Sequence, residues 1–219
     1  MPLLALFDVD GTLFLTDDPL SSEALLATLR DLYPVDPPDN AVERVDHQGQ
    51  TAKRIARLVL NAEGIDDAAA DERLDECCSR FAARYVTMLA AADTSAWRVA
   101  SEAPEGLARL QGAGVQLALL TGNPEPMARA RMFRLGLERF FPEGQGAFGC
   151  ESESRIELIE LARRRAGGWP AEQTVEIGDT PRDAETAHMA RVRSIVVGPE
   201  RGLTAVVELL LALNQGTVA

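Results

Sequence analysis

Two aspartates stand two positions apart at the end of an apolar run near the start of the chain. Residues 3–7 (LLALF) are followed at once by Asp8, Val9, Asp10 and Gly11. The run is short and apolar, which is typical of a buried strand, and carboxylates have no packing role where such a strand ends. In an open α/β sheet, ligands bind at the carboxyl ends of the strands. We therefore interpret Asp8 and Asp10 as parts of one site, the alternative being a turn that happens to carry two aspartates.

Polar residues follow two further predicted strands in the same way. Thr121, Gly122 and Asn123 come after the strand 115–120, and Gly178 and Asp179 come after the strand 174–177. Parallel strands bring their carboxyl ends to one edge of a sheet, so these groups can converge with the first pair.

Convergence of four carboxylates, those of Asp8, Asp10, Asp179 and Asp183, would need a compensating charge. Two like charges about 4 Å apart repel by roughly 4 kcal/mol at an effective dielectric constant of about 20. Either the pKa values rise or a cation lies among the carboxylates. Ligands that are all oxygen favour Mg²⁺, and the absence of His and Cys from these motifs argues against zinc.

Each of these features also has a purely structural interpretation. Thr121 and Asn123 could be a strand end and a helix cap, with no ligand. Asp183 is the third helical residue after a Thr180 cap, where a carboxylate is favourable by itself. Arg155 could be an exposed arginine that opens a helix. The order and spacing of the features together are less expected by chance than any one of them.

The elements that would position these residues alternate between strands and helices from about residue 93 onward. Such alternation predicts a parallel sheet covered on both faces. Residues 16–92 interrupt the pattern with amphipathic helices, a helix through Leu32 being capped by Ser21 or Ser22. We predict an α/β fold: a doubly wound, Rossmann-like parallel sheet formed by residues 1–15 and 93–219, with an inserted α-helical cap domain at 16–92.

Composition limits the partners and the compartment. The net charge of −12 argues against nucleic acid as a ligand. No apolar stretch is long enough to span a bilayer, and the first residues do not resemble a secretory signal, so we expect a cytoplasmic protein without a membrane partner, either a monomer or a homodimer. Because two of the three cysteines, Cys77, Cys78 and Cys150, are adjacent, we expect reduced thiols without a structural role.

The motifs resemble those of the haloacid dehalogenase-like superfamily, in its phosphatase branch with a helical cap. Residues 7–13 (FDVDGTL) resemble the first family motif, residues 119–123 (LLTGN) the second and residues 177–184 (IGDTPRDA) the fourth. The third motif is a basic residue near a helix start, usually lysine, and Arg155 is the best candidate here. The resemblance covers nearly the whole chain in motif order, although the cap matches only in length and helicity.

The resemblance implies a catalytic pair. Asp8 would be the nucleophile that forms an aspartyl-phosphate, and Asp10 would protonate the leaving oxygen and then activate water.

The resemblance also implies the ligands of phosphate and metal. Thr121, with the neighbouring Gly122 and Asn123, and Arg155 would bind phosphate oxygens. Mg²⁺ would be held by Asp8, Asp179, the backbone carbonyl of Asp10 and, directly or through a water, Asp183. The substrate would be a small phosphorylated metabolite, which the sequence does not identify.

Other branches of the superfamily give alternative functions. Dehalogenases and phosphonate-cleaving members lack an acid at the position of Asp10. The latter use a cap lysine, for which Lys53 would be the candidate, so Asp10 argues against that chemistry. Sugar-phosphate mutases keep both aspartates and remain an alternative, with the cap loop 47–51 as the segment that would face the site. A catalytically idle binding domain would be expected to lose Asp8 or Asp10. The phosphoglycolate phosphatase-like group is closest in architecture, which is an analogy only.

Overall fold

A parallel five-stranded sheet forms the centre of the computed structural model, which describes residues 2–198 and 201–216. The strand order is β3-β2-β1-β4-β5. β1 is therefore central, and it pairs in parallel with β2 and β4 over its whole length. The strands are β1 (Leu4–Phe7), β2 (Gln116–Thr121), β3 (Ala147–Phe148), β4 (Thr174–Gly178) and β5 (Arg193–Val196). This arrangement confirms the predicted doubly wound sheet.

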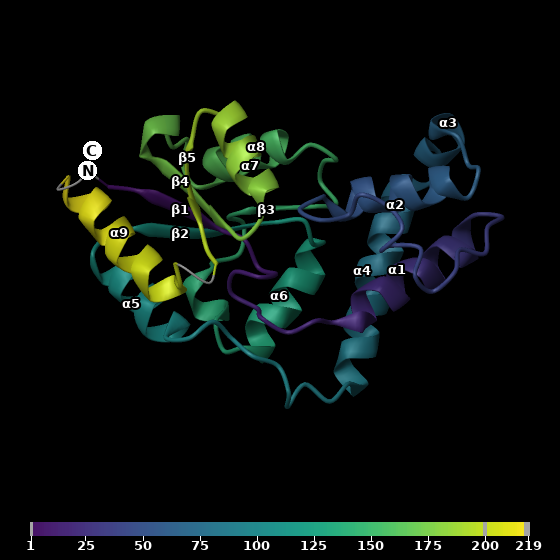
Figure 1. The fold of residues 1–219 in the computed structure, drawn as a ribbon, viewed down its shortest axis with the longest axis horizontal. Helices are drawn as coiled ribbons and strands as arrows, with labels where there is room; N and C mark the ends of the chain where they lie inside the picture. Colours follow the sequence, from purple (N-terminus) through teal and green to yellow (C-terminus); the bar gives the residue numbers. More distant parts are fainter. Residues whose placement is uncertain (1, 199–200, 217–219) are drawn as a thin grey trace.

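Helices cover both faces of the sheet (Figure 1). Successive side chains of β1 point to opposite faces, so Ala5 and Phe7 pack with one layer of helices and Leu4 and Leu6 with the other. None of the described helices combines the length and the apolar character needed to cross a membrane. The first layer holds α5 (Ala103–Gly112), α6 (Glu125–Arg134) and α9 (Leu203–Gln215), and the second holds α7 (Arg155–Arg165) and α8 (Pro181–Met189).

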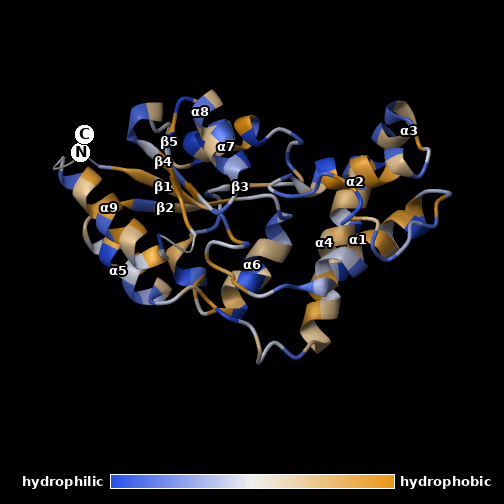
Figure 2. Cartoon of the chain, viewed as in Figure 1, coloured by the Kyte–Doolittle hydropathy of each residue, from blue (hydrophilic) through white to orange (hydrophobic). Residues whose placement is uncertain are grey.

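Four helices between β1 and α5 form a separate group, which we call the helical block (residues 19–91). They are α1 (Pro19–Leu32), α2 (Ala52–Ala62), α3 (Asp67–Asp71) and α4 (Leu74–Ala91). They enclose a hydrophobic cluster of their own, built from residues such as Leu29, Leu60 and Tyr85, and Met127 of α6 joins it. Figure 1 shows the block at the end of the molecule opposite the two termini. Figure 2 shows hydrophobic and hydrophilic residues interleaved along most helices, as amphipathic packing requires.

The helix starts agree with the sequence prediction at α8 and differ at α1 and α6. Thr180 and Asp183 form the expected capping box of α8. The cap of α1 is Asp18, whose carboxylate accepts from the backbone N–H of Leu20, so the prediction of a serine cap is wrong. The α6 helix has Pro124 at its cap position and no side-chain cap hydrogen bond. The alternative role of Asn123 as a helix cap is therefore wrong as well.

The prediction of three reduced thiols is also wrong. Cys78 and Cys150 form a disulfide with a Cα–Cα distance of 5.7 Å, and only Cys77 is free, buried in the helical block. The partners lie 72 residues apart in the sequence, one on α4 and one in the loop after β3. Such a pair depends on how the block packs on the sheet, which cysteine spacing does not reveal.

Candidate active site

The three predicted polar segments meet at one edge of the sheet. Asp8 and Asp10 follow β1, Thr121 ends β2, and Asp179 follows β4. Since β2 and β4 are the two neighbours of β1, their carboxyl ends flank the first aspartate pair. Gly11 lets the chain turn here with a φ of +71°, and a Cβ at that position would overlap the Asp179 carboxylate.

Three of the four predicted carboxylates form a cluster. Asp8, Asp179 and Asp183 each offer an oxygen that lies within 4.8 Å of the other two. Burial raises the pKa of Asp8 well above its usual range, although the guanidinium of Arg155 opposes the shift. Burial also raises the pKa of Asp179, and the nearby Asp183 adds to the effect. The cluster therefore carries an electrostatic cost that a cation would remove.

Arg155 is buried beside this cluster, with 5% of its surface exposed, so it is not an ordinary surface arginine. Its Nη2 lies 2.5 Å from Asp183, 3.4 Å from Glu176 and 3.9 Å from Asp8. Its Nε, also buried, has no hydrogen-bond partner among the described residues. Burial raises the pKa of Glu176 to about 7, with Arg155 opposing the shift. Arg155 thus starts α7 beside Asp8, with its buried Nε left without a partner among the described residues.

Asp183 serves the helix and the site together. One of its oxygens accepts from the backbone N–H of Thr180 at 2.9 Å and from the Thr180 hydroxyl at 2.6 Å, and the other accepts from Arg155. A Cβ on Gly178 would come within 2.5 Å of the Asp183 carboxyl carbon. The structural interpretation of Asp183 is thus confirmed, and the same side chain also lies in the carboxylate cluster.

The Asp10 side chain turns away from the cluster of the other three carboxylates. Its oxygens accept from Asn123 Nδ2 at 2.5 Å and from Arg131 Nη1 at 2.6 Å. In this arrangement, a contribution of Asp10 to a metal would therefore come from its backbone carbonyl.

The other three predicted phosphate ligands come from the end of β2, and one of them, Asn123, contacts Asp10. The buried Thr121 hydroxyl accepts from the backbone N–H of Asn123 at 3.2 Å and from its side chain at 3.1 Å. The Gly122 carbonyl accepts from the backbone N–H of Ala52 at 2.7 Å, so this loop also touches the helical block. A Cβ on Gly122 would come within 2.3 Å of the Gln50 carbonyl oxygen, which explains why glycine is needed there.

Sequence reasoning missed a buried arginine next to Asp10. Arg131 of α6 has 2% of its surface exposed and also bonds Asp18 at 2.9 Å and the Tyr85 hydroxyl at 3.0 Å. Its guanidinium lies over the rings of Phe14 and Tyr85. No local signal marks it, because α6 carries several arginines and only the packing buries this one.

A cavity of about 690 Å³ lies between this edge of the sheet and the helical block. The loop 47–50 lines it, as the sequence predicts for the segment that would face the site. Arg182 holds this loop by bonding the Gln48 carbonyl at 2.9 Å and the Asp46 carboxylate at 2.8 Å. Arg182 is therefore committed to the loop and is a poor substitute for Arg155.

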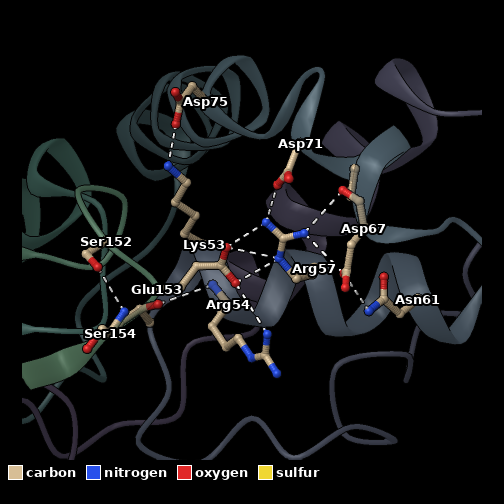
Figure 3. A network of polar contacts seen from close by, with 12 residues as sticks. Lys53, Arg54, Arg57, Asn61, Asp67, Asp71, Asp75, Ser152, Glu153 and Ser154 are labelled. Carbon is tan, nitrogen blue, oxygen red and sulfur yellow. Dashed lines mark hydrogen bonds and ion pairs between the residues drawn. The ribbon is translucent and has the colours of Figure 1, made fainter.

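Lys53 lies outside the cavity, which supports the argument against Schiff-base chemistry. Its ammonium pairs with Asp75 at 2.5 Å (Figure 3). The same view shows Arg57 of α2 between Asp71 and Glu153, and its Nη2 lies 2.7 Å from Glu153, which precedes α7. The Arg57–Glu153 pair attaches the helical block to the α/β part of the chain.

The side chains present fit a hard divalent cation. The clustered groups are three carboxylates without histidine or thiolate, and burial, with the neighbouring carboxylates adding to it, raises the pKa values of Asp8 and Asp179. Asp8, Asp179 and Asp183 are the candidates to hold it.

Comparison with known proteins agrees with this geometry. The family model described as "Hydrolase: haloacid dehalogenase-like hydrolase" matches residues 3–191. The chain belongs to this family of hydrolases.

A phosphoglycolate phosphatase of Rhodospirillum rubrum is 33% identical over 206 residues, which cover 90% of this chain and 80% of the relative. Together with the family match, this similarity makes the chain an enzyme of the phosphatase group.

Two solved structures show the same fold. CbbY from Rhodobacter sphaeroides in complex with phosphate superimposes with a TM-score of 0.64 at 22% identity, covering 90% of this chain and 86% of that one. The β-phosphoglucomutase of Clostridium difficile reaches a TM-score of 0.68 at 14% identity, covering 94% and 88%.

Proposed function

We propose that this chain is a Mg²⁺-dependent phosphatase that hydrolyses a small phosphorylated metabolite through an aspartyl-phosphate on Asp8. One observation carries the proposal: buried Asp8 lies beside Arg155 and within the carboxylate cluster, while the Asp10 carboxylate is held separately by Asn123 and Arg131. The site thus separates a nucleophile from an acid–base group. The similarity to a phosphoglycolate phosphatase supports the same reaction class.

The reaction divides into two displacements at phosphorus. An Asp8 oxygen forms a bond to phosphorus as the bond to the leaving oxygen breaks, and Asp10 gives its proton to that oxygen. Asp10, now a carboxylate, removes a proton from water, which attacks phosphorus. The bond to Asp8 breaks, and inorganic phosphate leaves.

The remaining site residues would bind charge. Asp8, Asp179, Asp183 and the Asp10 carbonyl would hold Mg²⁺, which when bound neutralises charge on the phosphoryl group and on these carboxylates. Arg155, which lines the cavity, would bind phosphate oxygens through its guanidinium. Thr121, Gly122 and Asn123 would complete the phosphate site from the end of β2.

The proposed organisation follows from the same assignment. Residues 16–92 would act as a cap domain that covers the cavity above a core of 1–15 and 93–219. We place the protein in the cytoplasm, where phosphorylated metabolites are found, as a monomer or homodimer.

Trapping of the covalent intermediate tests this mechanism. Asp10→Asn keeps the nucleophile but lacks the base, so with p-nitrophenyl phosphate, whose leaving group needs no proton, it should accumulate one added phosphoryl group. Asp8→Asn should acquire none. Intact mass spectrometry after acid quench measures both, and the unmodified chain is the reference.

Equal phosphorylation of Asp8→Asn would rule out Asp8 as the nucleophile. A mutase would return the phosphoryl group to a sugar phosphate, so release of inorganic phosphate in step with substrate loss separates the two activities.

A further inference from the structure

The cavity has two walls of different polarity, one formed by the sheet edge and the other by the helical block. The sheet edge contributes the carboxylates and Arg155. Besides His47, the block contributes apolar and uncharged polar side chains, among them Leu25, Ile55, Phe81, Ser21 and Ser22. The part of a substrate that leaves with its alcohol oxygen would contact this second wall.

Positive charge on the cavity wall is already neutralised. Of the described residues that line it, His47, Arg131 and Arg155 can carry a positive charge. Arg131 is bound by Asp10 at 2.6 Å and Asp18 at 2.9 Å. Arg155 belongs to the phosphate side, next to Asp8.

His47 offers an acceptor when its ring is neutral. Its Nδ1 lies 3.1 Å from the Val45 carbonyl oxygen, and a carbonyl can only accept, so Nδ1 carries a proton and donates it. In the neutral ring Nε2 can then only accept. That atom suits a substrate hydroxyl and repels a carboxylate oxygen.

One negative charge next to the block's wall, that of Asp17, is not neutralised by an ion pair with the described residues. Asp17 lines the cavity, is exposed and forms no ion pair with the described residues. A carboxylate on the leaving group would therefore meet a like charge and, among the described residues that line the cavity, find no unpaired arginine or lysine.

We propose that the substrate is the phosphate monoester of an uncharged alcohol that carries some hydrocarbon surface. This rests on the proposed phosphatase function and names its substrate class. Apolar atoms of the leaving group would pack against Leu25 and Phe81, and its hydroxyls would bond Ser21, Ser22 or His47. The leaving group of phosphoglycolate, glycolate, is a carboxylate. The proposed substrate class therefore differs from the substrate in the relative's name.

A matched substrate pair tests the charge directly. Phosphoglycolate and its carboxamide, 2-phosphoglycolamide, have nearly the same shape but differ by one negative charge. We expect kcat/KM for the amide to exceed that for phosphoglycolate at least tenfold, and 2-phenylethyl phosphate to exceed the amide. A kcat/KM for phosphoglycolate equal to or above that of its amide would overturn the inference.

p-Nitrophenyl phosphate in the same assay separates this inference from the proposed function. If neither it nor any of the three monoesters is hydrolysed with Mg²⁺ present, the proposed function fails. If it is hydrolysed and phosphoglycolate is preferred over its amide, only the substrate class is wrong.

Two variants and a control test the role of the wall. Asp17→Asn removes the like charge, and Ile55→Arg adds a cation. Both should lower the amide-to-acid ratio of kcat/KM, the second by tenfold or more. Glu43→Gln removes an exposed carboxylate of the same block that does not line the cavity, and it should leave the ratio unchanged. A ratio that neither Asp17→Asn nor Ile55→Arg lowers would contradict the inference, and thermal melting checks that each variant is folded.

Discussion

The guanidinium of Arg131 lies 2.6 Å from the carboxylate of Asp10, although the two residues are 121 positions apart in the sequence. The same guanidinium bonds Asp18, at the cap of α1, and Tyr85, on α4. One buried side chain therefore connects the proposed acid–base group to the first and last helices of the helical block.

Replacing Arg131 should affect stability and catalysis in separable ways. Arg131→Met leaves Asp18 buried without its cation, and breaking a buried ion pair costs about 3–5 kcal/mol of unfolding free energy. Arg131→Lys keeps the charge but cannot reach all three partners, so Asp10 should be misplaced and turnover should fall on the order of a hundredfold. Like Asp10→Asn, Arg131→Lys should accumulate phosphorylated enzyme with p-nitrophenyl phosphate. Arg129→Lys on the same helix is the matched control, and an Arg131→Lys chain with normal turnover would show that Arg131 does not position Asp10.

Removal of divalent metal should abolish activity, because three clustered carboxylates need a cation. Excess EDTA should stop hydrolysis of p-nitrophenyl phosphate, and added Mg²⁺ should restore it. Asp179→Asn should raise the Mg²⁺ concentration for half-maximal rate, because it removes one charged ligand. Unchanged activity in the chelator would refute the metal requirement.

Arg155→Ala should lower kcat on the order of a hundredfold, as loss of a preorganised charge-stabilising donor does. Arg155→Lys should recover part of that loss, because lysine keeps the charge but lacks the fork of donors. Steady-state kinetics measure both, with melting curves to detect damage from leaving Glu176 and Asp183 without their cation. Wild-type kinetics in Arg155→Ala would refute the third-motif assignment.

Reduction of the Cys78–Cys150 disulfide should lower stability. It closes a long loop, and removing such a bond typically costs about 2–5 kcal/mol. The melting temperature should therefore fall when dithiothreitol is added. Cys77→Ala, which removes the free thiol, should keep this response, whereas Cys78→Ser should lose it. Identical melting of the wild-type chain with and without reductant would show that the disulfide does not form in solution.

The sequence predicts those parts of the site that are encoded locally. Asp8, Asp179 and Asp183 each follow a strand or open a helix, so their convergence follows from a parallel sheet. The Thr180 cap is encoded within four residues and was predictable for the same reason.

Features that depend on packing between distant segments could not be predicted. The Asn123 side chain suits a helix cap by its local sequence, yet it bonds Asp10 because β2 lies next to β1. The burial of Arg131 depends on the block resting on α6. Likewise, no spacing rule indicates that Cys78 and Cys150 meet.

The Cys78–Cys150 disulfide limits how the helical block can move relative to the α/β part of the chain. The two chain crossings into the helical block lie side by side, since Leu15 N–H donates to the Arg98 carbonyl, so they act together as one hinge. With this hinge as its only attachment, the helical block could rotate as a rigid body. The Cys78–Cys150 disulfide joins α4 to the loop after β3 at a second point, away from this hinge. With two separate attachments, the helical block can no longer rotate about the hinge as a rigid body. While the disulfide is intact, entry to the cavity must therefore depend on local movements of loops such as 47–51. Rotation of the whole helical block requires that the disulfide be reduced first.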